Sequence, residues 1–503
     1  MFDSSKATHG RISLGVDGLD EVLHGGLPIN RLYLVQGDPG VGKTTLAMQF
    51  LLDGVRRSET VLYITLSETK EELTMVAHSH DWDISKIHLV EMASLDGDVR
   101  NETENTFFHP SEVELNKTIE ILLNEVKRIR PTRIVFDSLS ELRLLAETAL
   151  RYRRQILQLK QFFSGQKITV LLLDDRSGGS NNLHLESIAH GVLDIYRSYP
   201  DYGIARRQIK VQKLRGSSFY EGSHDLILRK GGMAVFPRLV AGDHKAKRGT
   251  HTLKTGIAGL DQLLGGGVHY GTSTLLMGPS GSGKSTLILH LLEQGAKRGE
   301  RGLLFIFDET MASVVNRASA LKIDIKSHID SGLIAIRQVD PAELSPGELT
   351  HHVRLAVEQE NTAIVAIDSI NGYMNAMPAE KFLNLQLHEL FIYLAHKGVI
   401  TLAVFTQQGI LGTIPSTIDL TYLADSVILF RFFESNGTVC QAISILKKRS
   451  GNHERSIREL TITASGLKVG HPLTNMQGVL TGTPSFFRED ERSTASQNVE
   501  SHS

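Results

Sequence analysis

The chain has 503 residues, of which 41% are hydrophobic and 22% are charged, and its net charge is −2. This composition is ordinary for a globular protein of about two to four domains, and it excludes a chain that is mainly disordered. A protein built mainly to hold a nucleic-acid backbone would carry a basic excess, which is absent here.

The N-terminus and the cysteine content bear on the cell compartment. Residues 1–10 are polar, so no signal peptide is predicted, and no apolar run approaches the length of a transmembrane helix. The single cysteine, Cys440, excludes an intrachain disulfide and a cysteine-only metal cluster, and it fits a reducing compartment. We therefore expect a cytoplasmic protein without a membrane span.

Five sequence features occur twice in the same order. Their spacing is far too long for a solenoid repeat, so we predict two tandem copies of one domain. The pairs are Gly15–Asp20 with Gly256–Asp261, Gly37–Thr44 with Gly278–Ser285, Glu68–Thr69 with Glu309–Thr310, Arg133–Ser138 with Ala363–Ser369, and Lys213–Gly216 with Lys447–Ser450.

The polar segment 241–250 is the expected linker between the copies. We place the first domain at residues 1–245 and the second at residues 246–488. The last segment, 489–503, is rich in Ser, Glu and Asn and almost free of apolar residues, which predicts a disordered tail.

Short apolar runs alternate with helical patterns in each copy, which predicts an α/β fold with a mainly parallel sheet flanked by helices. Ser111–Glu114 and Ser345–Glu348 have the pattern of helix-capping boxes, the second with Pro346 at the first helical position. The predicted strands are 31–36, 60–66, 133–137 and 167–174 in the first copy, and 273–277, 302–308, 363–368 and 399–406 in the second.

Two glycine-rich loops match G-x-x-x-x-G-K-[ST], and each lies between a predicted strand and a predicted helix, as a P-loop requires. The glycines let backbone N–H groups approach phosphate, and Lys43 and Lys284 would reach the β- and γ-phosphates of ATP. The predicted nucleotide-binding residues are Gly37, Gly40, Gly42, Lys43, Thr44 and Thr45, and Gly278, Gly281, Gly283, Lys284, Ser285 and Thr286.

Oxygen ligands for Mg²⁺ accompany each P-loop. Thr44 and Ser285 follow the lysines and would bind the ion. Asp137 and Asp368 end apolar strands, where an acid holds Mg²⁺ through water; a strand-ending aspartate is otherwise only a turn residue. Its recurrence after a P-loop in both copies favours the metal role.

A glutamate follows the second strand of each copy, at Glu68 and Glu309. It would face the phosphates and polarise the attacking water, unless it is simply an exposed loop residue. The preceding residue is Ser67 in the first copy and Asp308 in the second, so only the second copy has two adjacent carboxylates. The predicted catalytic residues are Glu68, Asp308 and Glu309, with Lys43 and Lys284.

Basic pairs flank a late turn in each copy, Lys213 with Arg215 and Lys447 with Arg449. In ring-forming P-loop proteins such cations can reach the γ-phosphate of a neighbouring subunit; the alternative is a solvated strand end. Asp174–Asp175 and Thr406–Gln408 end equivalent strands, and the sequence leaves open whether they sense the γ-phosphate or only end the strand.

Together these residues resemble the KaiC family of circadian clock proteins, over roughly residues 10–490. The resemblance implies tandem RecA-like domains in a double-ring homohexamer with Mg-ATP at the subunit interfaces. It also implies ATPase activity in both rings, and Ser/Thr autokinase and autophosphatase activity in the second. It is carried by Gly18–Pro28, the two P-loops, Ser67–Thr69, Asp308–Thr310, Lys213–Gly216 and Gly478–Pro484.

The chain departs from the family pattern in two places. The family has paired glutamates after the second strand, so Ser67 brings hydrolysis in the first copy into question. The adjacent phosphoacceptors of the family align with Thr421 and Tyr422, with Ser416 and Thr417 as nearby alternatives. Thr421 can also be read as an ordinary strand-flanking residue. These departures suggest a KaiC-like protein from outside the standard cyanobacterial clock.

The leading hypothesis is a KaiC-like ATPase and autokinase. Glu309, helped by Asp308, would activate water or the Thr421 hydroxyl of a neighbouring subunit, with Lys447 and Arg449 completing the site. Two alternatives stay open: a RecA- or RadA-like DNA-dependent ATPase, and a nucleotide-gated signalling scaffold with little turnover. The resemblance implies a KaiB-like protein or a sensor kinase as partner; we expect no membrane or nucleic-acid partner.

Overall fold

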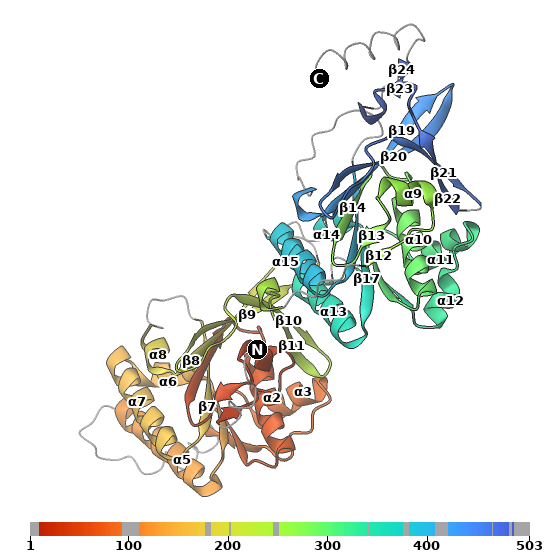
Figure 1. The fold of residues 1–503 in the computed structure, drawn as a ribbon. Helices are drawn as coiled ribbons and strands as arrows, with labels where there is room; N and C mark the ends of the chain where they lie inside the picture. Colours follow the sequence, from red (N-terminus) through yellow and green to blue (C-terminus); the bar gives the residue numbers. More distant parts are fainter. Residues whose placement is uncertain are drawn as a thin grey trace. The chain divides into compact units, whose positions relative to one another are not determined.

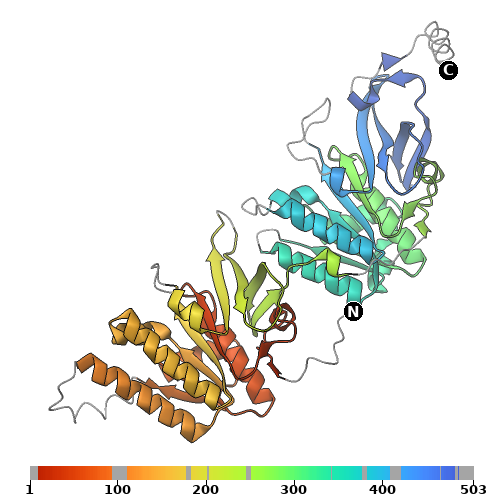
Figure 2. The ribbon, with the colours of Figure 1, turned by 60° about the vertical axis from the view of Figure 1, so that its left-hand side comes forward.

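The chain folds into two compact units, Met1–Arg238 and Leu239–Ser503 (Figures 1 and 2). No helix in the described segments has the length and apolar character needed to cross a membrane. The computed structural model describes residues 10–92, 110–176, 183–200, 203–244, 251–340, 343–375, 382–407, 421–464, 466–481 and 485–486.

The division between the units falls a few residues before the boundary expected at residue 245. The start of the expected linker packs into the second unit instead. The backbone N–H of Ala241 donates to the Glu389 carboxylate at 2.9 Å, and the His244 ring lies edge-on to Tyr393. The predicted disordered tail lies outside the described residues.

The described part of the first unit forms a nine-stranded sheet in the order β11-β10-β9-β8-β3-β7-β6-β4-β5. The strands from β8 to β5 run parallel, and β8 to β11 form an antiparallel extension. The bounds are β3 (Leu32–Gly37), β4 (Val61–Thr65), β5 (His88–Glu91), β6 (Arg133–Asp137), β7 (Thr169–Asp175), β8 (Gly191–Ser198), β9 (Arg206–Leu214), β10 (Ser223–Arg229) and β11 (Gly232–Phe236).

The described part of the second unit repeats this sheet strand by strand, in the order β16-β15-β17-β18-β14-β19-β20-β21-β22. The strands from β16 to β19 run parallel, and β19 to β22 form the antiparallel extension. The bounds are β14 (Ser273–Gly278), β15 (Arg301–Ile306), β16 (Ile334–Gln338), β17 (Thr362–Asp368), β18 (Ile400–Thr406), β19 (Ser426–Ser435), β20 (Thr438–Lys448), β21 (Arg458–Thr463) and β22 (Gly466–Pro472).

Three two-stranded ribbons and three short 3₁₀ helices complete the described strands and turns. The ribbons are β1 (Arg11–Ile12) with β2 (Leu27–Pro28), β12 (Thr252–Leu253) with β13 (Val268–His269), and β23 (Met476–Gln477) with β24 (Ser485–Phe486). The 3₁₀ helices are η2 (Ala241–Asp243), η3 (Thr421–Leu423) and η4 (Val479–Thr481).

Helices cover both faces of each sheet, as the continuous apolar strands require (Figure 1). The fold prediction is therefore confirmed. In the first unit the helices are α1 (Leu19–Val22), α2 (Lys43–Arg56), α3 (Lys70–Ser79), α5 (Pro110–Ile129), α6 (Leu139–Ala146), α7 (Ala149–Gly165) and α8 (Leu183–Ile188). In the second unit they are α9 (Ala258–Leu263), α10 (Lys284–Lys297), α11 (Met311–Ala320), α12 (Ile325–Asp330), α13 (Pro346–Gln359), α14 (Ile370–Asn375) and α15 (Leu383–His396).

The helix starts agree only partly with the predicted capping boxes. The Ser345 hydroxyl accepts from the Glu348 N–H at 3.2 Å, and Pro346 begins α13. However, α5 begins at Pro110, so Ser111 lies within the helix and not in the position before its first residue. A capping box that the sequence analysis missed joins Thr69 and Glu72 at the start of α3.

Arg133 begins β6 and is fully buried, which is unusual for a charged side chain. Its guanidinium bonds Asp53 at 3.0 Å and Glu59 at 2.6 Å, and it donates to the carbonyls of Ser13 and Phe50. The same strand position of the second unit holds an aliphatic side chain, Ile364. The two positions are equivalent, since Arg133 pairs with the first residue of β7 and Ile364 with the first residue of β18. The first unit therefore depends on a buried ion-pair network where the second depends on apolar packing.

We predict that Arg133→Ile lowers the free energy of unfolding of the first unit by about 3–5 kcal/mol, because Asp53 and Glu59 lose their buried cation. The only tryptophan, Trp82, lies in this unit, so its fluorescence during urea unfolding reports the loss. Ile364→Val is the control in the second unit and should leave the Trp82 transition in place. A loss below about 1 kcal/mol would contradict this role of Arg133.

Candidate functional site

Each P-loop joins the central strand of its sheet to a helix that begins at the predicted lysine. In the first unit the loop leads from β3 into α2, and in the second from β14 into α10. Gly42 and Gly283 precede these helices with φ angles of 111° and 101°, a left-handed backbone that favours glycine. The turn thereby directs the first helical N–H groups toward the carboxyl edge of the sheet.

Both P-loop lysines turn back onto their own loop. Lys43 Nζ donates to the carbonyls of Gly37 at 2.9 Å and Asp38 at 3.0 Å. Lys284 Nζ donates to the carbonyls of Gly278 at 2.8 Å and Pro279 at 2.6 Å. Burial lowers the pKa of Lys284 to about 8, partly offset by the charge of Asp368.

The structure brings each predicted Mg²⁺ hydroxyl to its predicted carboxylate. The Thr44 hydroxyl lies 3.4 Å from Asp137 Oδ2, which also accepts from the Tyr63 hydroxyl at 2.5 Å. In the second unit the Ser285 hydroxyl bonds Asp368. Burial raises the pKa of both aspartates because it disfavours their ionised form, and a bound cation would stabilise that form. One hydroxyl and one carboxylate fit Mg²⁺, which takes its other ligands from phosphate and water.

Glu68 lies beside this group in the first unit with an unsatisfied oxygen. Its Oε2 atom is buried and has no hydrogen-bond partner among the described residues. Burial raises the pKa of Glu68 to about 7, with further contributions from the negative charges of Asp137, Glu72 and Asp175. A carboxylate with this pKa accepts a proton efficiently at neutral pH.

The carboxylates of the second unit are both engaged. Asp308 Oδ2 accepts from the Ser369 hydroxyl at 2.7 Å. Glu309 forms a two-point ion pair with Arg317, at 2.6 and 2.7 Å. These side chains line a cavity of about 410 Å³ together with the P-loop, and its lining includes Lys284, Ser285, Thr286, Asp308, Glu309, Arg317, Asp368 and Thr406.

The strand ends that the sequence left open differ between the units. Asp175 ends β7 and forms an ion pair with Lys43 at 2.6 Å, whereas Asp174 is buried against Arg143. Thr406 holds the place of Asp175 in the second unit, because each residue pairs in register with the first glycine of its P-loop. The first P-loop lysine therefore has an anionic competitor for phosphate that the second lacks. Gln408 lies outside the described residues.

The four predicted trans cations contact backbone carbonyls within their own unit. Lys213 donates to the Glu186 carbonyl, and Arg215 to the Ser187 carbonyl at 2.8 Å. Lys447 donates to the carbonyls of Thr421 and Ala424, both at 2.8 Å, and Arg449 Nη2 lies 3.5 Å from the Tyr422 carbonyl. Lys447 and Arg449 are not among the described residues that line the cavity of the second unit.

The candidate phosphoacceptors Thr421 and Tyr422 form η3, just before β19. Thr421 is partly buried, whereas Tyr422 is 50% exposed and its ring centre lies 6.3 Å from that of His388. Neither is among the described residues that line the P-loop cavity of its own chain. Ser416 and Thr417 lie outside the described residues.

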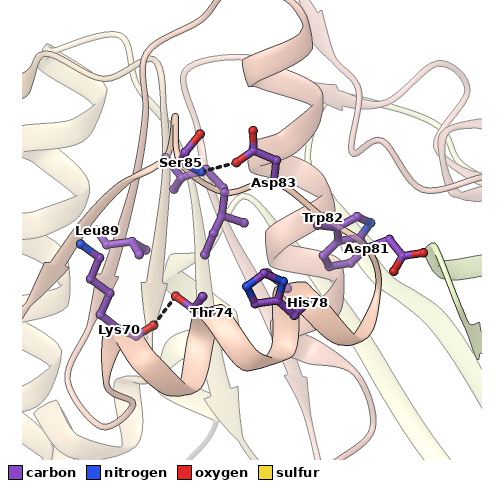
Figure 3. Close-up of a pocket in the computed structure, with 11 residues that line it drawn as sticks. Lys70, Thr74, His78, Asp81, Trp82, Asp83, Ser85 and Leu89 are labelled. Carbon is purple, nitrogen blue, oxygen red and sulfur yellow. Dashed lines mark hydrogen bonds between the residues drawn. The ribbon is translucent and has the colours of Figure 1, made fainter.

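A separate hollow of about 650 Å³ lies in the first unit between α3 and β5 (Figure 3). Two of its polar groups are already engaged, since Thr74 donates to the Lys70 carbonyl and Asp83 accepts from the Ser85 N–H. Lys70, His78 and Trp82 also line it, and no P-loop residue does. We therefore place the candidate site at the P-loops.

The Asp175 ion pair generates a prediction for nucleotide affinity. Asp175→Thr should tighten Mg-ATP binding at the first P-loop about three- to five-fold, because Lys43 loses a half-exposed carboxylate that competes with phosphate. Isothermal titration in a Lys284→Ala background reports the first site alone. The matched reverse change, Thr406→Asp in a Lys43→Ala background, should weaken binding; tighter binding there would contradict the argument.

Comparison with known proteins agrees with this geometry. A family model of the KaiC ATPase matches residues 12–240 and 253–474. The circadian clock oscillator protein KaiC of Picosynechococcus sp. is 26% identical, over 96% of this chain and 94% of that protein. KaiC of Thermostichus vulcanus is also 26% identical, over 97% and 95%, and KaiC 1 of Synechocystis sp. is 25% identical, over 97% and 94%. The chain therefore belongs to the KaiC family of ATPases.

Proposed function

We propose that both units hydrolyse Mg-ATP and that the second unit also transfers the γ-phosphoryl group to a hydroxyl of a neighbouring copy. The observation that carries this proposal is the second cavity, where Lys284, Ser285, Asp308, Glu309 and Asp368 converge. It combines phosphate-binding groups, Mg²⁺ ligands and carboxylates that can accept a proton. This is the set that phosphoryl transfer uses.

The roles of the residues follow from their positions. Mg²⁺, when bound, would neutralise charge on the phosphates, with Thr44 and Asp137 or Ser285 and Asp368 as its protein ligands. The lysines would release the loop carbonyls and take the β- and γ-phosphates. In the first unit Glu68 would accept the proton of the attacking water as the water oxygen bonds the γ-phosphorus and ADP leaves.

The positions of the four basic residues predicted to act on a neighbouring copy are the basis for proposing a ring. All four cations contact the backbone of their own units, and Lys447 and Arg449 are not among the described residues that line the cavity of the second unit. We propose that they complete the site of a neighbouring copy, as arginine fingers do, in a homohexamer with ATP at the interfaces.

Two of these cations, Lys447 and Arg449, contact the backbone of the acceptor residues. Lys447 and Arg449 contact the carbonyls of Thr421 and Tyr422, so a segment that approaches a neighbour with these cations would carry the acceptor hydroxyl with it. In the proposed transfer the Thr421 oxygen bonds the γ-phosphorus, the bond to the ADP oxygen breaks, and Asp308 or Glu309 takes the hydroxyl proton. Thr421 is our first choice of acceptor, and Tyr422 the second.

We propose a role in timing or signalling, in which nucleotide state and phosphorylation are read by a partner such as a KaiB-like protein or a sensor kinase. The relatives named above are clock oscillator proteins, which supports this class of role. Loading of both P-loops requires a supply of Mg-ATP, and we propose the cytoplasm as the compartment.

The autokinase proposal predicts covalent phosphate on η3. Incubation with Mg-ATP and tandem mass spectrometry should find phosphate on Thr421, because Lys447 contacts the backbone carbonyl of this residue. Lys284→Ala should abolish it and Lys43→Ala should retain it; Thr421→Val should remove the modification where Tyr422→Phe does not. Production of ADP without covalent phosphate would leave an ATPase and exclude the kinase step.

The first site should show a distinct pH dependence. In a Lys284→Ala background, turnover should rise about ten-fold between pH 6 and pH 8, because Glu68, with a pKa of about 7, must lose its proton before it can act as the base. Glu68→Gln should be much slower and lose this dependence. A wild-type profile that is flat across this range would show that Glu68 is not the base.

A further inference from the structure

The two sites differ in what holds the glutamate after the second strand. Glu309 is bonded through both carboxylate oxygens to the two terminal nitrogens of Arg317, at 2.6 and 2.7 Å. The Glu309 side chain is 22% exposed and the Arg317 side chain 32%, so water screens this pair only partly. Both side chains line the cavity that contains the P-loop.

The equivalent position of the first unit holds a valine. Helices α3 and α11 are equivalent, since each follows a threonine whose side chain caps it, Thr69 or Thr310. Counting from these caps, Arg317 corresponds to Val76, and both residues are partly buried. No guanidinium can therefore reach Glu68 from this helix, in agreement with the unbonded Oε2 atom of Glu68.

A two-point guanidinium contact changes what a carboxylate can do. It occupies one lone pair on each oxygen and holds the carboxylate in one orientation, so the carboxylate is less free to turn toward a water molecule and take its proton. The other charged groups around Glu309 are the anions Asp308 and Asp368 and the cation Lys284. Of the residues that the structure describes, only Arg317 forms an ion pair with Glu309.

We propose that Arg317 is a positioning residue that restrains Glu309 and slows ATP hydrolysis at the second site. The inference rests on the proposed function, since it assumes that this site binds Mg-ATP. By limiting the activation of water, the restraint would preserve the γ-phosphoryl group for transfer to a hydroxyl. The first site lacks the restraint and would be the faster hydrolase.

A purely structural role for Arg317 predicts the opposite change. If the ion pair only anchored α11 beside the P-loop, its removal would loosen the site and lower turnover. If Arg317 instead restrains the base, removal of Arg317 raises turnover. Because misfolding does not produce a faster enzyme, the sign of the change separates the two roles.

The test exchanges the two residues between the sites. In a Lys43→Ala background, where only the second site binds nucleotide, Arg317→Val should raise kcat for ATP hydrolysis at least about ten-fold, part of the effect of a general base. KM should change little, because Arg317 acts through Glu309. Arg317→Lys keeps the charge without the two-point contact and should give a smaller gain.

The reverse exchange uses the first site. In a Lys284→Ala background, Val76→Arg should lower kcat at least about ten-fold while Mg-ATP still binds in isothermal titration. Val76→Leu is the size control and should keep most of the activity.

The outcomes are distinguishable. A second-site kcat that falls or stays unchanged in Arg317→Val overturns the restraint, whatever the first site does. The ATPase part of the proposed function fails separately, through loss of turnover at the first site in the Lys284→Ala protein with Val76 intact. A rise in kcat at the second site together with a fall at the first supports the inference.

Discussion

The buried ammonium groups of Lys43 and Lys284 are the constraint on which each unit depends. A cation at this depth needs oxygen partners, and the glycine loop supplies them as its own carbonyls. The loop can fold around the lysine only because it joins the central strand of a sheet covered on both faces to a helix N-terminus. In the proposed function phosphate would replace these carbonyls, and the candidate Mg²⁺ ligands and carboxylates already lie near the lysine.

Within this shared frame, the two sites differ in the charges that surround them. In the first site Asp175 pairs with the lysine, and Glu68 Oε2 has no hydrogen-bond partner among the described residues. In the second site Thr406 replaces Asp175, and Glu309 is bonded to Arg317. In the proposed function, Glu68 would accept a proton from water near neutral pH, whereas Arg317 would limit Glu309 in this role. Ser67 brought ATP hydrolysis in the first unit into question. With Glu68 as the proposed base, we instead expect the first unit to hydrolyse ATP faster than the second.

The sequence was sufficient for the parts of the fold that local pattern determines. All eight predicted strands occur within two residues of their predicted ends, because a parallel strand covered on both faces is a continuous apolar run. The antiparallel strands such as β9 and β21 were missed, since one face is partly exposed and polar residues interrupt them. The P-loops were visible as motifs, but the Arg317 contact joins a loop to a helix eight residues later and matches no motif. The difference between Arg317 in the second unit and Val76 in the first becomes visible only when α11 and α3 are aligned.

The central claim is that the two sites process ATP unequally, and the most direct measurement is the nucleotide found in each. The wild-type protein would be incubated with Mg-ATP, frozen within one turnover of the slower site, and its structure determined by electron cryomicroscopy. We expect ADP in the first site and intact ATP in the second, with Glu309 still bonded to Arg317. ATP in the first site with ADP in the second, or the same nucleotide in both, would contradict the account.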